Sequence, residues 1–148
     1  MALLLLLGDG ERVPGEEMLV VHIDKIGDLA IVECEGRVVR SEAAFQLHQA
    51  ITSQRDARII VLDLSEVSTI DGGGLGMLVF LRQWTYERDI RLKLYNPTET
   101  VRGRLERTNS IPDFDIATRD ELVAFLARAA SHARAASHAR AASHTQAA

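Results

Sequence analysis

One stretch of sequence decides the fold of this chain: Arg58-Ile-Ile-Val-Leu-Asp-Leu64, followed by Ser65-Glu-Val-Ser-Thr-Ile-Asp-Gly-Gly-Gly-Leu-Gly76. The first part is a near-continuous run of β-branched and aliphatic residues, which is typical of a strand covered on both faces. Residues 75 to 84, Leu-Gly-Met-Leu-Val-Phe-Leu-Arg-Gln-Trp, are regular enough to form a helix. The glycine-rich turn between them therefore lies at the carboxyl end of a central strand, where α/β proteins place functional groups.

The organisation of this segment resembles the STAS domain of anti-sigma factor antagonists. In that family a hydrophobic strand ending in Asp-Leu is followed by Val-Ser, then by Asp-Ser-Ser/Thr-Gly-Leu-Gly and a helix. The matching residues here are Asp63-Leu64, Val67-Ser68, Asp71 and Gly74-Leu75-Gly76. By order of elements the resemblance runs from about Met18 to Leu126, and it implies the STAS fold.

The comparison with this family also shows that the chain lacks the family's phosphorylated serine. In the family, the first Ser after the Asp is phosphorylated by the partner kinase, but this chain has Gly72 at that place and Gly73 at the next. Ser68 and Thr69 are the nearest hydroxyls and are weak candidates for phosphorylation, because strand geometry would point them differently from position 72. We therefore predict a docking loop without the family's phosphoacceptor.

Composition indicates one ordinary globular domain. The chain has 148 residues, 47% hydrophobic and 26% charged, with a net charge of −4. Without the last 22 residues, 14 basic residues face 21 acidic ones, which argues against nucleic acid as the main partner. Cys34 is the single cysteine and stands between two glutamates, so we predict a buried, inert thiol and a reducing cytoplasmic location.

Both ends of the chain differ from the rest. Residues 1–17 contain five consecutive leucines, far fewer than the roughly 20 apolar residues that span a bilayer. We interpret them as a dispensable leader, with an extra strand or an oligomer contact as the alternative. Residues 127–148 repeat Ala-Arg-Ala-Ala-Ser-His three times, and six residues at 100° each place successive histidines on different sides of a helix. We predict a low-complexity tail that extends the last helix and frays, leaving residues 18–126 as the domain.

Periodicity along the chain predicts an α/β fold with the order β-β-α-β-α-β-α-β-α and a mixed β-sheet whose centre is parallel. This is also the order that the STAS resemblance implies. The expected strands cover residues 19–23, 29–34, 58–64, 90–94 and 112–116. The expected helices cover residues 41–51 and 75–84, a segment beginning near Pro97, and a segment opened by the capping box Thr118-Arg-Asp-Glu121.

The helix after the turn is apolar on every side. Met77, Leu81 and Trp84 share one stripe, while Leu75 and Val79 belong to another. Either neighbouring elements cover all of this surface, or part of it is exposed beside the turn, where the resembling family docks its anti-sigma partner. The predicted partner-binding residues are Asp71, Gly72, Gly73, Gly74, Leu75, Met77, Leu78 and Leu81. Asp71 also suits the N-cap of the helix.

The sequence gives little support to catalysis or cofactor binding. The turn lacks the Lys-Ser/Thr of a phosphate-binding P-loop, and Met77 stands where a dinucleotide fingerprint needs Gly or Ala. His22 and His48 have no partners at metal-ligand or triad spacing. We therefore predict no cofactor, no metal site and no catalytic residue.

Two functions remain open. The first is a cytoplasmic, non-catalytic protein that resembles an anti-sigma factor antagonist and sequesters a kinase-like anti-sigma factor without the usual phosphorylation switch. The alternative is a STAS-type accessory subunit of a membrane transporter for lipids or anions, contacting its ATPase subunit. Neither requires nucleic acid or direct membrane insertion, and both leave the oligomeric state open.

Overall fold

The computed structural model describes residues 19–39, 42–107 and 114–147, with the side chains of residue 42 and residues 137–147 left out. The predicted leader, residues 1–17, lies outside these ranges. So do Ser41, the first residue of the predicted first helix, and residues 112 and 113 of the predicted edge strand.

In the described part of the chain, five strands and four helices follow one another in the predicted order. They are β1 (Val20–Ile26), β2 (Leu29–Val38), α2 (Glu42–Thr52), β3 (Ile59–Ile70), α3 (Gly72–Glu87), β4 (Arg91–Tyr95), α4 (Glu99–Arg107), β5 (Asp115–Ala117) and α5 (Arg119–Ala147). The strands form one sheet in the order β1-β2-β3-β4-β5, in which β1 pairs with β2 antiparallel and the other pairs are parallel. The predicted mixed sheet with a parallel centre is confirmed.

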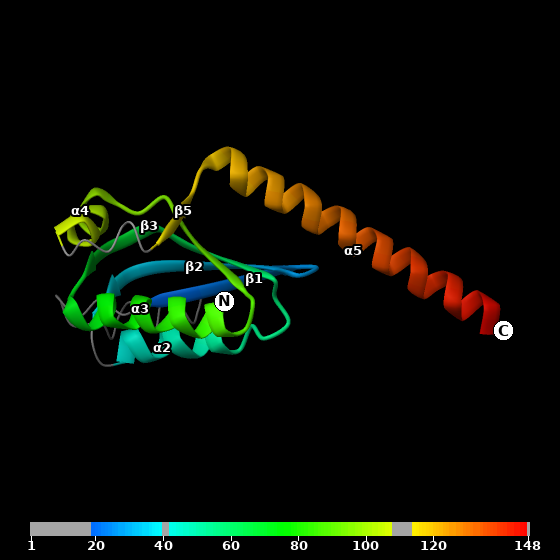
Figure 1. The fold of residues 1–148 in the computed structure, drawn as a ribbon, viewed down its shortest axis with the longest axis horizontal. Coiled ribbons are helices and arrows are strands. Elements are labelled where there is room, and N and C mark those ends of the chain that lie inside the picture. Colours follow the sequence, from blue (N-terminus) through cyan, green and yellow to red (C-terminus); the bar gives the residue numbers. More distant parts are fainter. Residues whose placement is uncertain (1–18, 40–41, 108–113, 148) are drawn as a thin grey trace, which may run out of the picture.

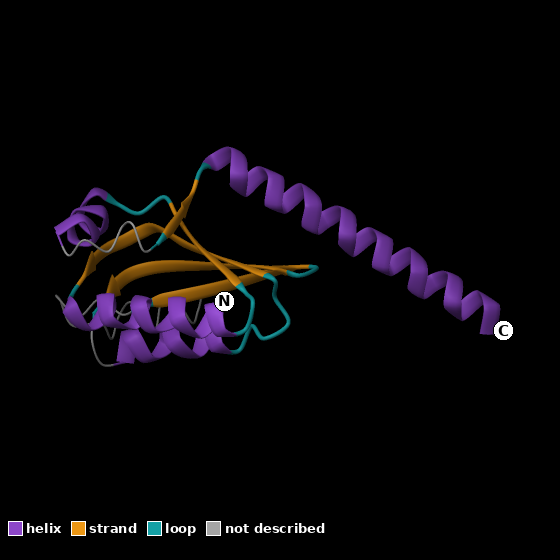
Figure 2. Cartoon of the chain, in the orientation of Figure 1, coloured by secondary structure: helices purple, strands orange, loops and turns teal. Residues whose placement is uncertain are grey.

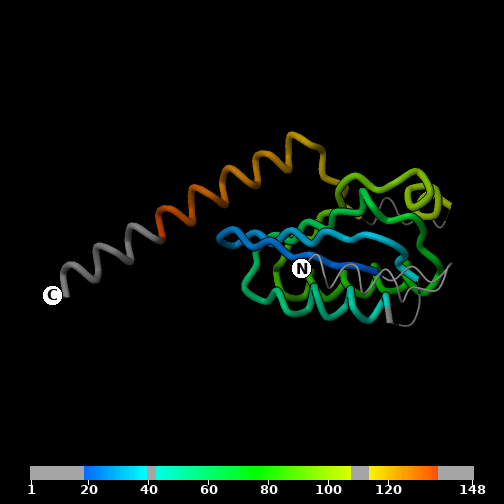
Figure 3. Tube along the Cα trace, turned by 180° about the vertical axis from the view of Figure 1, so that it is seen from behind, coloured from blue at the N-terminus to red at the C-terminus, as the bar shows by residue number. Residues whose placement is uncertain are grey.

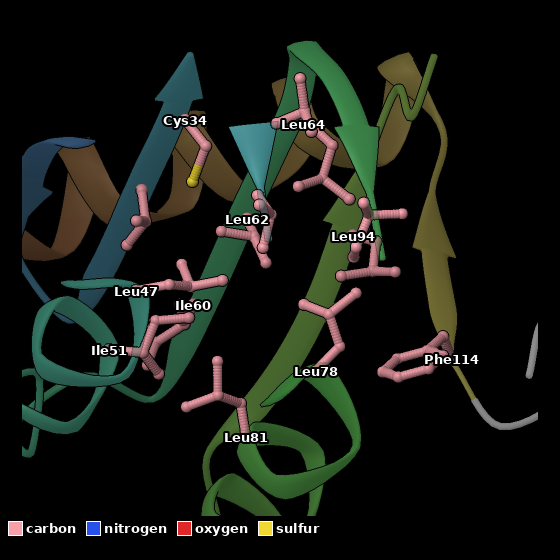
Figure 4. Close-up of a cluster of buried hydrophobic side chains, with 14 of the residues drawn as sticks. Cys34, Leu47, Ile51, Ile60, Leu62, Leu64, Leu78, Leu81, Leu94 and Phe114 are labelled. Carbon is pink, nitrogen blue, oxygen red and sulfur yellow. The ribbon is translucent and has the colours of Figure 1, made fainter. Parts of the chain in front are cut away.

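Helices cover both faces of the sheet (Figures 1 and 2). Alternate residues of β3 point to opposite sides, as strand geometry requires. Ile60 and Leu62 belong to the main core under α2 and α3, while Val61 packs in a second cluster with Phe125 of α5. Figure 4 shows part of the main core, where Leu78 of α3 lies with side chains of the central strands. The apolar run at residues 58–64 is therefore explained by burial on both faces.

Strand β3 is longer than the sequence predicts. It continues through Ile70, because Glu66 and Val67 pair with β2 after a first register shift, and Thr69 and Ile70 pair with it after a second. Val67 and Ile70 are buried there, while Glu66 and Ser68 are exposed. The predicted end of the strand at residue 64 is thus wrong, and the turn before α3 is reduced to Asp71.

Helix α5 begins at the predicted capping box and runs to Ala147. The Thr118 amide donates to Glu121 Oε1 at 3.1 Å, and the Glu121 amide donates to Thr118 Oγ1 at 3.1 Å. The first turns pack on the sheet through Phe125 and Ala129, so packing extends beyond the predicted boundary at residue 126. Farther along, the helix projects away from the sheet (Figure 3). Within the described ranges, no helix has the length and apolar character needed to cross a membrane.

Candidate functional site: the turn at Asp71 and the exposed face of helix α3

Asp71 joins the end of β3 to the first turn of α3. Its carboxylate Oδ1 accepts a hydrogen bond from the Gly74 amide at 2.8 Å, and its carbonyl oxygen accepts from the Leu75 amide at 2.9 Å. Its own amide donates to the Val38 carbonyl oxygen at 3.3 Å. A side chain that satisfies a free amide of the first helical turn is an N-cap. The N-cap interpretation of Asp71 is therefore confirmed.

Gly74 fixes the helix against the end of β2. A Cβ atom added there would lie 2.7 Å from Ile70 Cγ1 and closer still to the Val38 carbonyl oxygen. Real Cβ atoms essentially never approach other atoms this closely. Only glycine fits at this position, because the backbone of α3 approaches the backbone of β2 directly.

Two other glycines of this segment, Gly72 and Gly76, serve no such packing. A Cβ at Gly72 or at Gly76 would meet no atom within 4 Å, and both residues have ordinary negative φ angles. Gly72 and Gly73 are exposed. The fold would accept a serine side chain at position 72, so the missing hydroxyl is a difference in chemistry and not a steric requirement.

Burial divides the predicted partner-binding residues into core positions and exposed positions. Leu75, Leu78 and Leu81 are buried in the main core, and Met77 is half-buried against it. Gly74 is buried as well. The line of residues at i, i+4 and i+7 from Gly74 faces the sheet, because the glycine lets that side of the helix approach most closely. These leucines therefore belong to the core in this structure, and their contact with a partner stays a prediction.

The exposed apolar surface lies on the opposite side of α3 and continues onto α2. It consists of the neighbouring rings of Phe45, His48 and Phe80 together with Val79, the exposed residue before Phe80 in the sequence, and we call it the aromatic patch. Phe45 is 58% exposed and Phe80 46% exposed. The His48 ring stacks on Phe45 with centroids 6.2 Å apart and planes 9° apart, and it lies 5.1 Å from the Phe80 ring. The buried Nδ1 atom of His48 has no hydrogen-bond partner within the described part of the chain.

The aromatic patch is continuous with the exposed glycines of the turn. Gly72, Gly76 and Phe80 follow one another at intervals of four residues and lie on one side of α3. Phe45 and Phe80 were not among the predicted partner-binding residues. The available signal was Gly74, since a glycine that must approach the sheet also determines which side of the helix faces solvent.

The remaining hydroxyl and thiol candidates lie away from the turn. Ser68 and Thr69 both belong to β3, and Ser68 Oγ donates to the Gly36 carbonyl oxygen at 3.2 Å. Cys34 is buried, and this burial, followed by the negative charge of Asp63, raises the pKa of its thiol to about 12. The predicted burial of the thiol is confirmed, and its low reactivity stays a prediction.

Within the described residues, His22 and His48 are not arranged as metal ligands. His22 is exposed, with Nε2 3.2 Å from Asp24 Oδ1, and His48 belongs to the aromatic patch. Among the residues described, no group of three or more histidine, cysteine or carboxylate side chains is arranged to hold a metal ion.

Comparison with solved structures shows what the fold resembles. A putative anti-sigma factor antagonist from Thermotoga maritima is 22% identical, with a TM-score of 0.63 over 72% of this chain and 93% of that one. The anti-sigma factor antagonist SpoIIAA in its unphosphorylated form is 18% identical, with a TM-score of 0.60 over 70% of this chain and 93% of the other. SLC26A9 is 12% identical, with a TM-score of 0.59 over 88% of this chain and 27% of its own.

No curated protein matches the sequence. The family model of the STAS domain, in contrast, matches residues 19–122, which is most of the chain and includes every strand, the turn at Asp71 and the start of α5. The chain belongs to the STAS domain family.

Proposed function

We propose that this protein is a non-catalytic regulator that acts as an anti-sigma factor antagonist. It docks on a kinase-like anti-sigma factor through the turn at Asp71 and the aromatic patch, and so frees a sigma factor. Membership of the STAS family and the likeness in fold to two anti-sigma factor antagonists support this proposal. One observation carries it: the exposed first turn of α3 continues directly into exposed aromatic side chains.

The physical basis of the docking is burial of the aromatic patch. Two exposed phenylalanines that share contact with one histidine ring are uncommon on a protein that works alone, and aromatic residues are enriched at the centres of protein interfaces. Gly72, Gly73 and Gly76 leave the backbone of the first helical turn open to close approach by a partner. The surface is therefore apolar at its centre and has accessible backbone at one end.

The proposal also holds that the usual phosphorylation switch is absent. Position 72 has no hydroxyl, and Ser68 and Thr69 lie in a strand rather than at the helix start. Binding would then be controlled by the amounts of the proteins, or by a partner that has lost kinase activity. The protein would act in the cytoplasm, where sigma factors are found.

Docking is tested by measuring binding to an anti-sigma factor encoded beside this gene. Val79→Ala removes apolar area from the aromatic patch, and Val123→Ala is the matched control, because Val123 is a similarly exposed valine on α5. We expect the first variant to bind several-fold more weakly and the second to bind as the wild type does. Equal binding by both variants would place the interface elsewhere.

Loss of the switch is tested separately with the same partner and ATP. The mass of the wild type should not change, while Gly72→Ser, which has space for its side chain, should gain one phosphate if the partner retains kinase activity. Phosphate on Ser68 or Thr69 of the wild type would overturn this part of the proposal.

A second candidate function is that of a STAS-type accessory subunit of a membrane transporter. The likeness to a part of the much longer SLC26A9 chain favours it, because that likeness shows this fold within a larger protein. Genes for an ABC permease and ATPase next to this one would support the transporter function, whereas sigma, anti-sigma or phosphatase genes would support the regulator.

A further inference from the structure

A cavity of about 600 Å³ lies at the end of the sheet opposite to the turn at Asp71. It is enclosed by the turn between β1 and β2, the loops before β3 and β4, and the first part of α5, and Figure 2 shows these loops gathered at one end of the sheet. The twelve residues of β3 separate the two ends by about 36 Å at 3.3 Å per residue. The cavity is therefore separate from the proposed docking surface.

Basic side chains surround this cavity. Its lining includes Arg55, Arg58, Arg88, Arg91, Arg128 and His132. Three carboxylates, of Asp28, Asp56 and Asp89, also line it, so the arginines exceed the aspartates by two. The whole chain has a net charge of −4. A local excess of positive charge on an acidic protein indicates a place that attracts anions.

Two of the arginines are held in place by aromatic rings. The Arg88 guanidinium lies 4.3 Å from the ring centroid of Trp84 and donates to the Trp84 carbonyl oxygen at 3.1 Å. The Arg91 guanidinium lies 5.8 Å from the ring centroid of Phe125. A guanidinium stacked on a ring is preorganised, so less conformational freedom is lost when it binds an anion.

Arg88 Nη1 lies 3.9 Å from Glu87 Oε2, whereas two other arginines have their charge available. Arg55 and Arg128 are exposed and form no ion pair with any residue that the structure describes. Arg58 has only a long ion pair, with Nε 3.8 Å from Asp28 Oδ2. A planar guanidinium can donate two parallel hydrogen bonds to a phosphoryl group.

The inner wall of the cavity is apolar. Leu29, Ala57, Phe125 and Ala129 are buried and line it. Cavities that hold small molecules are typically 300–1,000 Å³, with an apolar lining and a few polar groups that fix the ligand. A long polyanion such as nucleic acid would be repelled by the acidic remainder of the protein.

We propose that this cavity binds a small organic phosphate, with the phosphoryl group held between the arginines of the rim and an apolar or planar part resting on Phe125 and Leu29. The full-length protein is titrated calorimetrically with 1-naphthyl phosphate at low salt. Inorganic phosphate provides the charge alone, and 1-naphthol provides the apolar part alone. We expect 1-naphthyl phosphate to bind most tightly and more weakly as salt is added, because the charges are exposed.

The residues are tested with paired variants. Arg55→Ala/Arg128→Ala should weaken the binding of 1-naphthyl phosphate about tenfold or more. Arg102→Ala/Arg119→Ala removes two exposed arginines that do not line the cavity and should bind as the wild type does. Unchanged Trp84 fluorescence confirms that each variant is folded. The proposal is overturned if the wild type does not bind 1-naphthyl phosphate, if 1-naphthol binds equally well, or if the two double variants bind it alike.

Discussion

The close approach of α3 to β2 at Gly74 can be tested by one methyl group. In Gly74→Ala the new Cβ would start 2.7 Å from Ile70 Cγ1 and closer to the Val38 carbonyl oxygen, whereas ordinary contacts begin near 3.4 Å. The Ile70 side chain must therefore move by about 0.7 Å and the Val38 backbone by more. Backbone cannot rotate away as a flexible side chain can, so the strain remains in the folded state.

The size of the effect follows from two opposing contributions. Overpacking in a well-packed interior costs about 1–3 kcal/mol. Replacing glycine by alanine in a helix gains up to about 1 kcal/mol through lower backbone entropy in the unfolded chain. We therefore expect Gly74→Ala to lower the free energy of unfolding by about 1–2 kcal/mol. The midpoint of thermal unfolding should fall by about 3–6 °C for a chain of this size.

Gly76→Ala provides the matched control, because the same methyl group enters open space two residues farther along the helix. It should raise the free energy of unfolding by about 0.5–1 kcal/mol. Urea unfolding followed by the fluorescence of Trp84, the single buried tryptophan, measures both variants with one probe. If Gly74→Ala is as stable as Gly76→Ala, then α3 does not approach β2 as described.

Three further predictions follow from the core and the start of α5. Burial raises the pKa of the Cys34 thiol to about 12, so iodoacetamide at mildly alkaline pH should modify it only after unfolding, as mass spectrometry would show. The pKa of Glu121 is lowered, mainly by a hydrogen bond from the Thr118 amide and also by the nearby positive charge of Lys93, while desolvation opposes the shift. This carboxylate therefore stabilises the fold at pH values above its unfolded pKa, and the stabilisation is lost as pH falls through its folded pKa. Glu121→Gln should flatten that acid limb in pH-dependent thermal unfolding, and an unchanged limb would contradict the assignment. Lys93 Nζ lies 2.5 Å from Asp115 Oδ2. The Lys93 side chain is only 4% exposed, whereas that of Asp115 is 59% exposed. Asp115→Asn leaves the buried ammonium with a weaker partner and should therefore lower the free energy of unfolding by about 1–3 kcal/mol. Lys93→Met leaves the Asp115 carboxylate in water and should lower it less in the same urea assay.

The sheet could be predicted from the sequence because its signals are local. The apolar run before residue 65 requires cover on both faces, and the crossover helices require parallel neighbours. The extension of β3 to Ile70 could not be predicted in this way. Glu66, Ser68 and Thr69 are typical of a turn, and only pairing with β2 beyond its register shifts turns them into a strand. Tertiary pairing overrides local propensity at such positions.

The proposed docking surface adjoins the predicted turn, but it lies on the other side of the helix from the predicted leucines. A helix that is apolar all round carries two stripes, and periodicity alone gives no reason to bury one rather than the other. Asp71 was predictable as an N-cap, since a carboxylate before a helix has a local role. The aromatic patch was not, because Phe45 and Phe80 come from helices that only the folded sheet brings together.

Gly74 links the stability of the fold to the exposure of the aromatic patch. Because position 74 lacks room for a Cβ while positions 72 and 76 have it, α3 rests on the sheet in one rotation about its axis, with Leu78 and Leu81 inward. In that rotation Phe80 must face outward beside α2. A side chain at position 74 would lift or turn the helix and so change the proposed docking surface as well as the core. Binding and stability should therefore be lost together in Gly74→Ala, whereas Val79→Ala should weaken binding with only a small effect on stability. These two patterns separate a residue that positions the surface from one that belongs to it.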